Sequence, residues 1–184
     1  MFKTIVHHTV QDLENPEYVE TQAPFKMLNR GMGTYLGEGY YFWDNHFDLA
    51  CWWGEVHCDK KYMICKADFQ MPTDDICDLV GSRKDQLFFQ KCMEILKAKA
   101  NTMESIITLL LKLEAQPQQR GIFPYKAIRA VDVSKGKYAE HLVNFNANKK
   151  GFVILNPKMI ICLFKKAPGV LNNFKIIYPS KYED

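Results

Sequence analysis

The chain has 184 residues, of which 47% are hydrophobic, and its formal net charge is +3 at pH 7. This length and composition predict a single domain, residues 1–184, with enough chain to bury a sizeable core. The small charge excess does not by itself indicate a nucleic-acid-binding protein. Because the chain has no repeat and no low-complexity segment, one compact fold has to carry the function.

The cysteines show no Cys-x-x-Cys pair and no spacing typical of a zinc site; they lie at positions 51, 58, 65, 77, 92 and 162. We therefore expect reduced thiols in a cytoplasmic protein that holds no metal. The one imaginable cluster fits no closed zinc pattern; it would combine His46, Cys51, His57 and Cys58. No apolar run approaches the roughly eighteen residues of a membrane span, and the amino terminus lacks the apolar core of a signal peptide, so we expect no membrane partner.

The first predicted strand covers residues 2–10, FKTIVHHTV, and carries a pair of histidines. Alternation along a strand places His7 and Thr9 on one face and His8 on the other. Two adjacent histidines near a terminus are compatible with an exposed strand end, with an incidental metal-binding pair, or with a ligand site. The residues alone leave these three alternatives open.

A connecting region follows over residues 11–35. The Asn-Pro pair at 15–16 is a turn signal, and a short helix is possible around residues 17–22. Gly31 and Gly33 come just before the next strand. They indicate either a plain connecting loop or a mobile loop that covers a pocket.

The stretch over residues 36–54, LGEGYYFWDNHFDLACWWG, is where we expect the active centre. Gly37 and Gly39 allow tight turning and the close approach of a ligand, because they lack a Cβ atom. A short aromatic strand over residues 40–42 follows them. Asp44 is then expected to cap a helix, whose apolar stripe consists of Phe47, Ala50 and Cys51.

Trp52 does not fit this apolar stripe. Each helical residue turns by about 100°, so Trp52 falls among polar positions, whereas Trp53 falls nearer the core side. A tryptophan that points away from the core needs another partner, and a flat ligand ring is one. The alternative is a core helix with one partly exposed tryptophan.

The remainder of the chain mixes strands and helices. We expect amphipathic helices and flanking strands at the following places: a strand over 62–69, helices over 82–99 and 101–116, strands over 127–132, 151–155 and 159–164, and a turn over 134–137. Asn101 and Glu104 have a spacing close to that of a capping box. The two helices are expected to form an insertion over residues 82–116 whose apolar stripes pack on the sheet.

The central stretch resembles a segment of the ADP-ribosyltransferase superfamily, most closely its poly(ADP-ribose) polymerase-like branch. In that family a Gly-x-Gly-x-Tyr-Phe motif closes the nicotinamide pocket, and a second aromatic residue lies eleven positions after the tyrosine. Here the motif contains Gly37, Gly39, Tyr41 and Phe42, and the eleventh residue after Tyr41 is Trp52. The resemblance implies that Gly39 belongs to the pocket, that Tyr41 is the middle member of the His-Tyr-Glu signature, and that Trp52 stacks on nicotinamide in place of a tyrosine.

The first strand is similar to the family's His-Gly-Thr or His-Gly-Ser segment. His7 matches the histidine that holds a ribose hydroxyl, and Thr9 matches the hydroxyl residue and would help to fix the carboxamide of nicotinamide. His8 replaces the glycine, so that a side chain crowds a place where the family keeps none. The resemblance thus implies that His7, His8 and Thr9 bind NAD and that His7 and Tyr41 are catalytic.

The Asn-Pro segment near the carboxyl terminus is also similar, but it departs at the catalytic glutamate. In the family this glutamate lies six positions before the proline, and here that position is Gly151. A carboxylate there stabilises the positive charge that develops on the ribose. Without it, three outcomes remain: slow transfer of a single ADP-ribose, as in family members with an apolar residue at that position; binding of the dinucleotide without turnover; or use of another carboxylate, such as Glu38, Glu55 or Glu140.

We therefore expect an α+β domain with a split, mostly antiparallel sheet flanked by helices, resembling the ADP-ribosyltransferase fold. The expected function is NAD-dependent mono-ADP-ribosyl transfer to a macromolecular acceptor, a protein or a nucleic acid, with NAD as substrate and no metal. Two alternatives stay open. One is a catalytically inactive module that binds NAD or ADP-ribose, and the other is an interaction protein that uses the helical insertion over residues 82–116.

Overall fold

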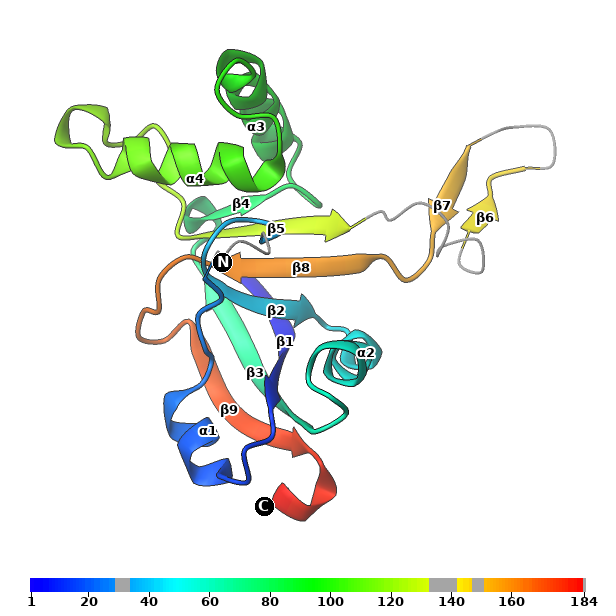
Figure 1. Cartoon of the computed structure of the whole chain (residues 1–184). Helices are drawn as coiled ribbons and strands as arrows, with labels where there is room; N and C mark the ends of the chain where they lie inside the picture. The colour runs from blue at the N-terminus through cyan, green and yellow to red at the C-terminus, as the bar shows by residue number, and fades with distance from the viewer. Residues whose placement is uncertain (29–33, 133–141, 147–150, 184) are drawn as a thin grey trace.

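The computed structural model describes residues 1–28, 34–132, 142–146 and 151–183, and it is organised around one seven-stranded sheet (Figure 1). The strands of this sheet are β1 Phe2–Gln11, β2 Tyr40–Asp44, β3 Tyr62–Met71, β4 Ile76–Asp78, β5 Ala127–Asp132, β8 Lys158–Leu163 and β9 Leu171–Tyr178. Their order is β4-β5-β8-β2-β1-β3-β9. All neighbours pair antiparallel except β4 and β5. The expected α+β class with a mostly antiparallel sheet is therefore confirmed.

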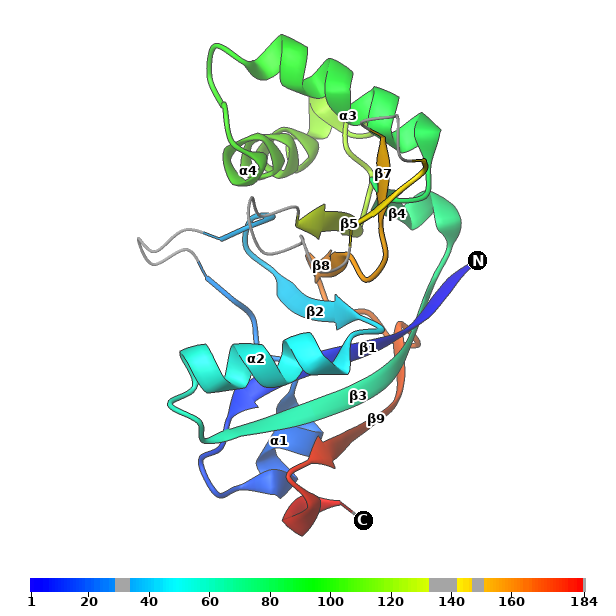
Figure 2. The ribbon, with the colours of Figure 1, turned by 90° about the vertical axis from the view of Figure 1, so that its right-hand side faces the viewer.

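Helices cover the two faces of the sheet unequally; they are α1 Pro16–Gln22, α2 Phe47–His57, α3 Arg83–Leu96 and α4 Met103–Glu114. Buried residues of α2, α3 and α4 share one apolar cluster with strand residues such as Trp43 and Ile160. α1 packs through Val19 on a different cluster, which contains Val10 and Ile176. Figure 2 shows α2 lying along β1 and β3, with α3 and α4 grouped beside β4 and β5. Within the described ranges, no helix combines the length and the apolar character that a bilayer span requires.

The helical insertion expected over residues 82–116 corresponds to α3 and α4, which lie between β4 and β5 in the chain. The capping box of α4 is formed by Thr102 and Ser105. The expected box with Asn101 and Glu104 is wrong, because Thr102 occupies the cap position and the carboxylate of Glu104 binds Thr34 instead.

The start of α2 also differs from the expectation. Its cap residue is His46, whose ring Nδ1 accepts the N–H of Leu49 at 3.3 Å. Asp44 ends β2 and is buried, where it accepts the hydroxyl of Thr4 and forms an ion pair with Arg129 Nε at 2.6 Å. Asp44 is therefore not the helix cap, because a cation on β5 and a hydroxyl on β1 hold its carboxylate in the sheet.

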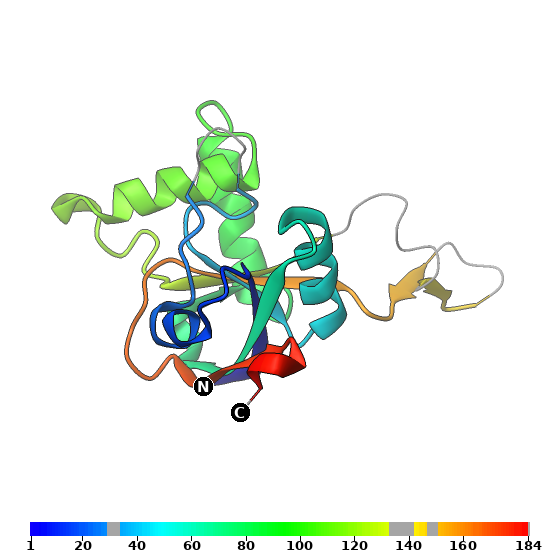
Figure 3. The same ribbon diagram turned by 60° about the horizontal axis from the view of Figure 1, so that its bottom comes forward.

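A second, two-stranded sheet consists of β6 Leu142–Asn144 and β7 Phe152–Ile154. This hairpin projects from the main body (Figure 3), and its apolar side chains are largely exposed, with Phe145 at 73%. The strand expected over 151–155 is therefore present, but it does not join the seven-stranded sheet. The sequence pattern did not indicate β4 or β9, and the turn expected over 134–137 lies outside the described residues.

The ladder between β1 and β2 is much shorter than the strands themselves. β1 pairs with β3 along its whole length, and β2 pairs with β8 from Tyr40 to Trp43. Between β1 and β2, the paired residues are Val6 with Asp44 and His7 with Trp43. The two strands therefore diverge after His7, and a space opens between them.

Candidate functional site

A partly open cavity lies where β1 and β2 diverge. Its volume is about 70 Å³, which is small beside typical ligand sites of roughly 300–1,000 Å³. It is therefore too small to enclose a whole dinucleotide. The described lining residues include no carboxylate and are mostly aromatic or apolar: His8, Thr9, Phe25, Met27, Tyr35, Tyr41, Phe42, Trp43, Trp53 and Ile160.

Strand and helix residues form one side of the cavity, the sheet wall, which consists of Thr9, Tyr41, Trp43, Trp53 and Ile160. The hydroxyl of Thr9 donates to the backbone carbonyl of Ala50 in α2 at 2.8 Å and so ties β1 to this helix. The rings of Trp43 and Trp53 lie 6.2 Å apart at an interplanar angle of 60°. The two rings thus pack against each other in a tilted arrangement that is common among aromatic side chains.

The other side, the loop wall, consists of residues 23–28 and 34–39, and it places Phe25, Met27 and Tyr35 on the cavity. Its two segments are joined by the backbones of Met27 and Gly39, with N–H···O distances of 2.8 and 3.2 Å. Further backbone groups of this wall bond to side chains of the sheet and of α4. The loop wall therefore depends on contacts between residues that are distant in sequence.

Tyr41 joins the two walls. Its hydroxyl accepts the N–H of Leu36 at 2.8 Å and donates to the carbonyl of Gly37 at 2.6 Å. Burial, and then the neighbouring Cys162 thiol, raise the pKa of Tyr41 above its ordinary value of 10.0, so the hydroxyl keeps its proton. The hydroxyl is thus bound to the loop, and a ligand in the cavity would meet the aromatic ring of Tyr41.

His8 lies where β1 and β2 diverge and lines the cavity. Its Nε2 accepts the N–H of Phe25 at 3.1 Å, so the proton lies on Nδ1, which donates to the carbonyl of Tyr41 at 2.8 Å. Burial lowers the pKa of His8 to about 4, against an opposing effect of the bond to Tyr41. The neutral ring of His8 therefore acts as a link between β1, β2 and the loop wall.

His7 lies on the opposite face of β1, under the first turn of α2. Its ring contacts Phe47 edge-on at 5.8 Å and only 6% of the residue is exposed. Burial lowers its pKa, and the positive charge of Lys66 and the neighbouring His46 lower it further. His7 does not line the cavity, but it pairs with Trp43 and lies two positions before Thr9, which both do.

The two adjacent tryptophans of α2 point to different surroundings. Trp53 lines the cavity and its ring also lies 4.0 Å from that of His57. Trp52 is absent from the described lining; its ring contacts Trp43 at 6.4 Å, and the ammonium of Lys158 lies 5.0 Å above it. The structure therefore places Trp53, rather than the Trp52 of the motif, beside Tyr41.

Gly39 lies at the start of β2 against β8. A Cβ atom on Gly39 would clash with the Cys162 sulfur and would lie 2.8 Å from the carbonyl oxygen of Leu163. Glycine is therefore required here for the close approach of two strands. Gly39 thus holds the end of the loop wall against β8 without lining the cavity.

Gly151, the residue at the family's glutamate position, lies beside Phe145 in the projecting hairpin and not at the cavity. The strand that takes the place next to β2 is β8, in which Ile160 pairs with Trp43 and lines the cavity. An apolar side chain therefore occupies this position in the sheet wall.

Two of the alternative carboxylates, Glu38 and Glu55, are not among the described lining residues. Glu38 is exposed and forms an ion pair with Lys26 at 3.4 Å, and Glu55 is exposed on α2. Glu140 belongs to the part of the chain that is not described, as do Gly31 and Gly33. Across residues 1–28, 34–132, 142–146 and 151–183, no group of three or more histidine, cysteine or acidic residues is arranged to hold a metal ion.

Sequence reasoning missed several lining residues, among them Trp43, Trp53 and Ile160. Strand alternation from Tyr41 already places Trp43 on the same face, so that signal was available. Ile160 reaches the cavity only because β8 pairs with β2 in this register, and no local pattern reports that pairing.

Comparisons of the chain with protein-family models, with curated proteins and with solved structures found no match. The resemblance of residues 37–42 and Trp52 to the ADP-ribosyltransferases therefore stays a prediction. Any function has to follow from that resemblance and from the chemistry of the cavity residues.

Proposed function

We propose that this chain is an NAD-dependent mono-ADP-ribosyltransferase that modifies a macromolecular acceptor, and that its sheet and helices form an ADP-ribosyltransferase-like fold. One observation carries the proposal: the divergence of β1 and β2 forms a cavity from residues 8–9, 41–43 and α2. Residues 8–9 are distant in sequence from the other two segments, and the motif resemblance connects the same segments through a nicotinamide pocket.

The sheet wall suits a nicotinamide ring. Tyr41, Trp43 and Trp53 offer aromatic faces, and the nicotinamide of NAD is a flat ring with a positive charge, which such faces attract. The carboxamide needs hydrogen-bonding partners, and the Thr9 oxygen keeps acceptor capacity after it donates to Ala50. Because the cavity is small, most of the dinucleotide would lie outside it.

His7 adds a polar atom that protein groups do not satisfy. Its Nδ1 is buried and has no hydrogen-bond partner among the described residues. Buried polar side-chain atoms are nearly always paired with protein or water, so this orphaned nitrogen supports a partner that the described residues do not supply, such as a ribose hydroxyl. This is the role that the resemblance implies for His7.

The reaction breaks the bond between ribose C1′ and the nicotinamide nitrogen. The electron pair leaves with nicotinamide, positive charge develops on the ribose, and a nucleophile of the acceptor bonds to C1′ and loses a proton. A carboxylate would stabilise this charge, but the described lining includes none. Stacking and orientation of nicotinamide then have to accelerate the cleavage without a carboxylate. This supports slow transfer of single ADP-ribose units rather than chain growth.

A second candidate is a module that binds NAD or ADP-ribose without turnover. The apolar Ile160 and the absence of a carboxylate from the described lining favour it. This candidate uses the same cavity and the same aromatic faces. The two functions differ only in whether the bound dinucleotide is cleaved.

Release of nicotinamide from labelled NAD by the purified protein tests the proposal. We expect slow release by the wild type and loss of it in His7→Ala. His46→Asn is the matched control, since it changes a neighbouring histidine but keeps a side chain able to cap α2. Saturable NAD binding without release would select the binding module, and neither binding nor release would contradict both.

A further inference from the structure

We propose that Glu104 of α4 is a positioning residue for the cavity, through which the helical insertion sets how tightly the site holds its ligand. The inference rests on the proposed NAD site. It assigns to the insertion a part in that same site, in addition to its packing on the sheet.

Glu104 holds the start of the segment over residues 34–39. Its Oε1 accepts the backbone N–H of Thr34 at 3.0 Å and the hydroxyl of Thr34 at 2.9 Å. Thr34 is buried, so its two donors would be costly to leave without partners. The carboxylate of Glu104 therefore fixes both the backbone and the side chain of this residue.

The same helix also supports the middle of the segment. A Cβ atom on Gly37 would lie 3.5 Å from both Ile107 and Thr108, so α4 is in van der Waals reach of the Gly37 backbone. Leu36 is buried in one apolar cluster with Ile107. Residues 34–37 therefore lie along α4, with the bond to Glu104 at one end.

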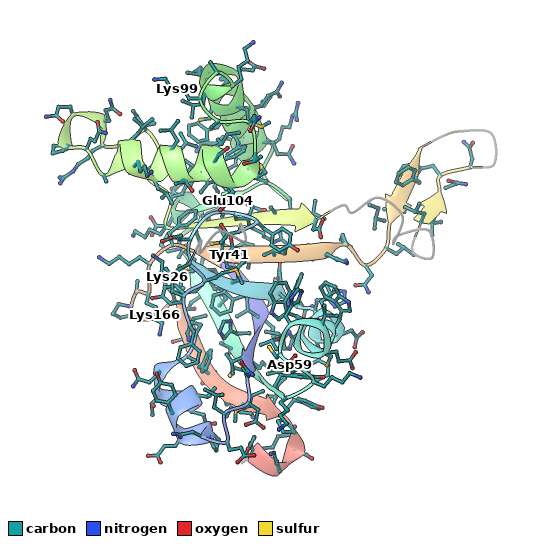
Figure 4. All side chains as sticks on the ribbon, viewed as in Figure 1. Lys26, Tyr41, Asp59, Lys99, Glu104 and Lys166 are labelled. Carbon is teal, nitrogen blue, oxygen red and sulfur yellow. The ribbon has the colours of Figure 1, made fainter. Side chains whose placement is uncertain are left out.

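This segment reaches the cavity by two routes. Tyr35 lines the cavity directly, and the N–H of Leu36 and the carbonyl of Gly37 hold the hydroxyl of Tyr41. Figure 4 labels Glu104 and Tyr41 where α4 meets the strands. Loss of the Glu104 contact would therefore loosen the loop wall and the bonds that fix the ring of Tyr41.

Glu114 offers a matched control on the same helix. Its carboxylate also accepts backbone amides, from Gly121 at 2.9 Å and from Phe123 at 2.8 Å. These amides lie in the connection that follows α4, and neither residue lines the cavity. A substitution at Glu114 removes a similar contact from the same helix but leaves residues 34–39 in place.

The test combines hydrogen exchange with NAD binding for the wild type, Glu104→Ala, Glu104→Gln and Glu114→Ala. We expect Glu104→Ala to raise amide exchange at residues 34–37 by about tenfold, because the anchoring bonds are lost. We also expect Glu104→Ala to raise the Kd for NAD by a similar factor. Its kcat for nicotinamide release should stay within twofold of the wild-type value. Glu104→Gln keeps an acceptor oxygen, so its amide exchange at residues 34–37 and its Kd for NAD should stay close to those of the wild type. Glu114→Ala should change amide exchange only around residues 121–123.

Unchanged exchange at residues 34–37 in Glu104→Ala would overturn the inference, and so would an equal effect of Glu114→Ala on the Kd. The exchange measurement needs no ligand. If the wild type binds no NAD, the proposed function fails, while exchange still decides whether Glu104 holds the loop wall. Melting temperatures of all variants show whether a changed Kd reflects a folded protein.

Discussion

The two walls of the cavity are built in different ways. In the sheet wall, Tyr41 and Trp43 belong to β2, which is paired with β8 in a regular ladder. In the loop wall, the Phe25 amide bonds to the ring of His8, and the Leu36 amide bonds to the hydroxyl of Tyr41. The first wall is stabilised by its own strands, whereas the second is held by one backbone bridge between Met27 and Gly39 and by individual side chains from other parts of the chain.

This difference explains where ligand binding can be adjusted. A regular ladder opens only at a high free energy, while a segment held by single contacts opens at a lower one. The loop wall is therefore the side that can move when a ligand enters or leaves. The sheet wall supplies the fixed aromatic faces.

The largest effect is expected from Gly39→Ala, at the point where the end of the loop wall lies against β8 of the sheet. The new Cβ atom would lie 2.8 Å from the carbonyl oxygen of Leu163 in β8, and this backbone oxygen cannot move without disturbing the ladder. We expect a loss of about 3 kcal/mol of unfolding free energy, measured by urea denaturation. Gly151→Ala, in the exposed hairpin, should change the unfolding free energy by less than about 0.5 kcal/mol. An equal loss of unfolding free energy in the two variants would contradict the close packing of Gly39 against β8.

An intermediate loss of unfolding free energy is expected at acidic pH, because His8 links the two walls in its neutral form. Burial lowers the pKa of His8 from 6.5 to about 4, so between these values the unfolded chain takes up a proton that the folded chain does not. The contribution of His8 to stability is therefore complete above pH 6.5 and is lost as the pH falls toward 4, at up to about 1.4 kcal/mol per pH unit.

Unfolding free energies of the wild type and His8→Gln between pH 7 and 4.5 test this expectation. The variant removes the titrating group, so its free energy should fall less steeply with acid than that of the wild type. Parallel pH profiles would show that the ring of His8 is not held in its neutral form by the fold.

The smallest effect is expected at the outer edge of the loop wall. The ion pair between Lys26 and Glu38 spans 3.4 Å, and the two side chains are 39% and 46% exposed. Exposed pairs contribute little, so Glu38→Gln should change stability by less than about 0.5 kcal/mol. It should also leave nicotinamide release within twofold; a large loss of release would instead identify Glu38 as the replacement carboxylate.

Much of the sheet could be predicted from the sequence, because alternation and helical spacing are local signals. The strand with His7, the strand with Tyr41 and both helices of the insertion were indicated in this way. β4 and β9 were not, since β4 has only three residues and β9 follows the last patterned segment. The place of β8 beside β2 is a matter of long-range pairing, which local patterns do not report.

The site was predictable to a smaller extent. The sequence indicated Tyr41, Thr9 and His8, which line the cavity, but it favoured Trp52 over Trp53. The two tryptophans differ by one helical step of about 100°, and the side that faces the ligand depends on how α2 sits on the sheet. The contact between Glu104 and Thr34 joins residues seventy positions apart, so no local pattern could show it.

NAD binding by Trp53→Leu and Trp52→Leu, measured by calorimetry beside the wild type, tests the central claim most directly. The cavity as described predicts that Trp53→Leu weakens binding by at least about tenfold, the scale of a lost stacking contact, and that Trp52→Leu stays within twofold. The reverse order would place the nicotinamide ring on the other side of α2. No binding by the folded wild type would contradict the assignment of this cavity to NAD.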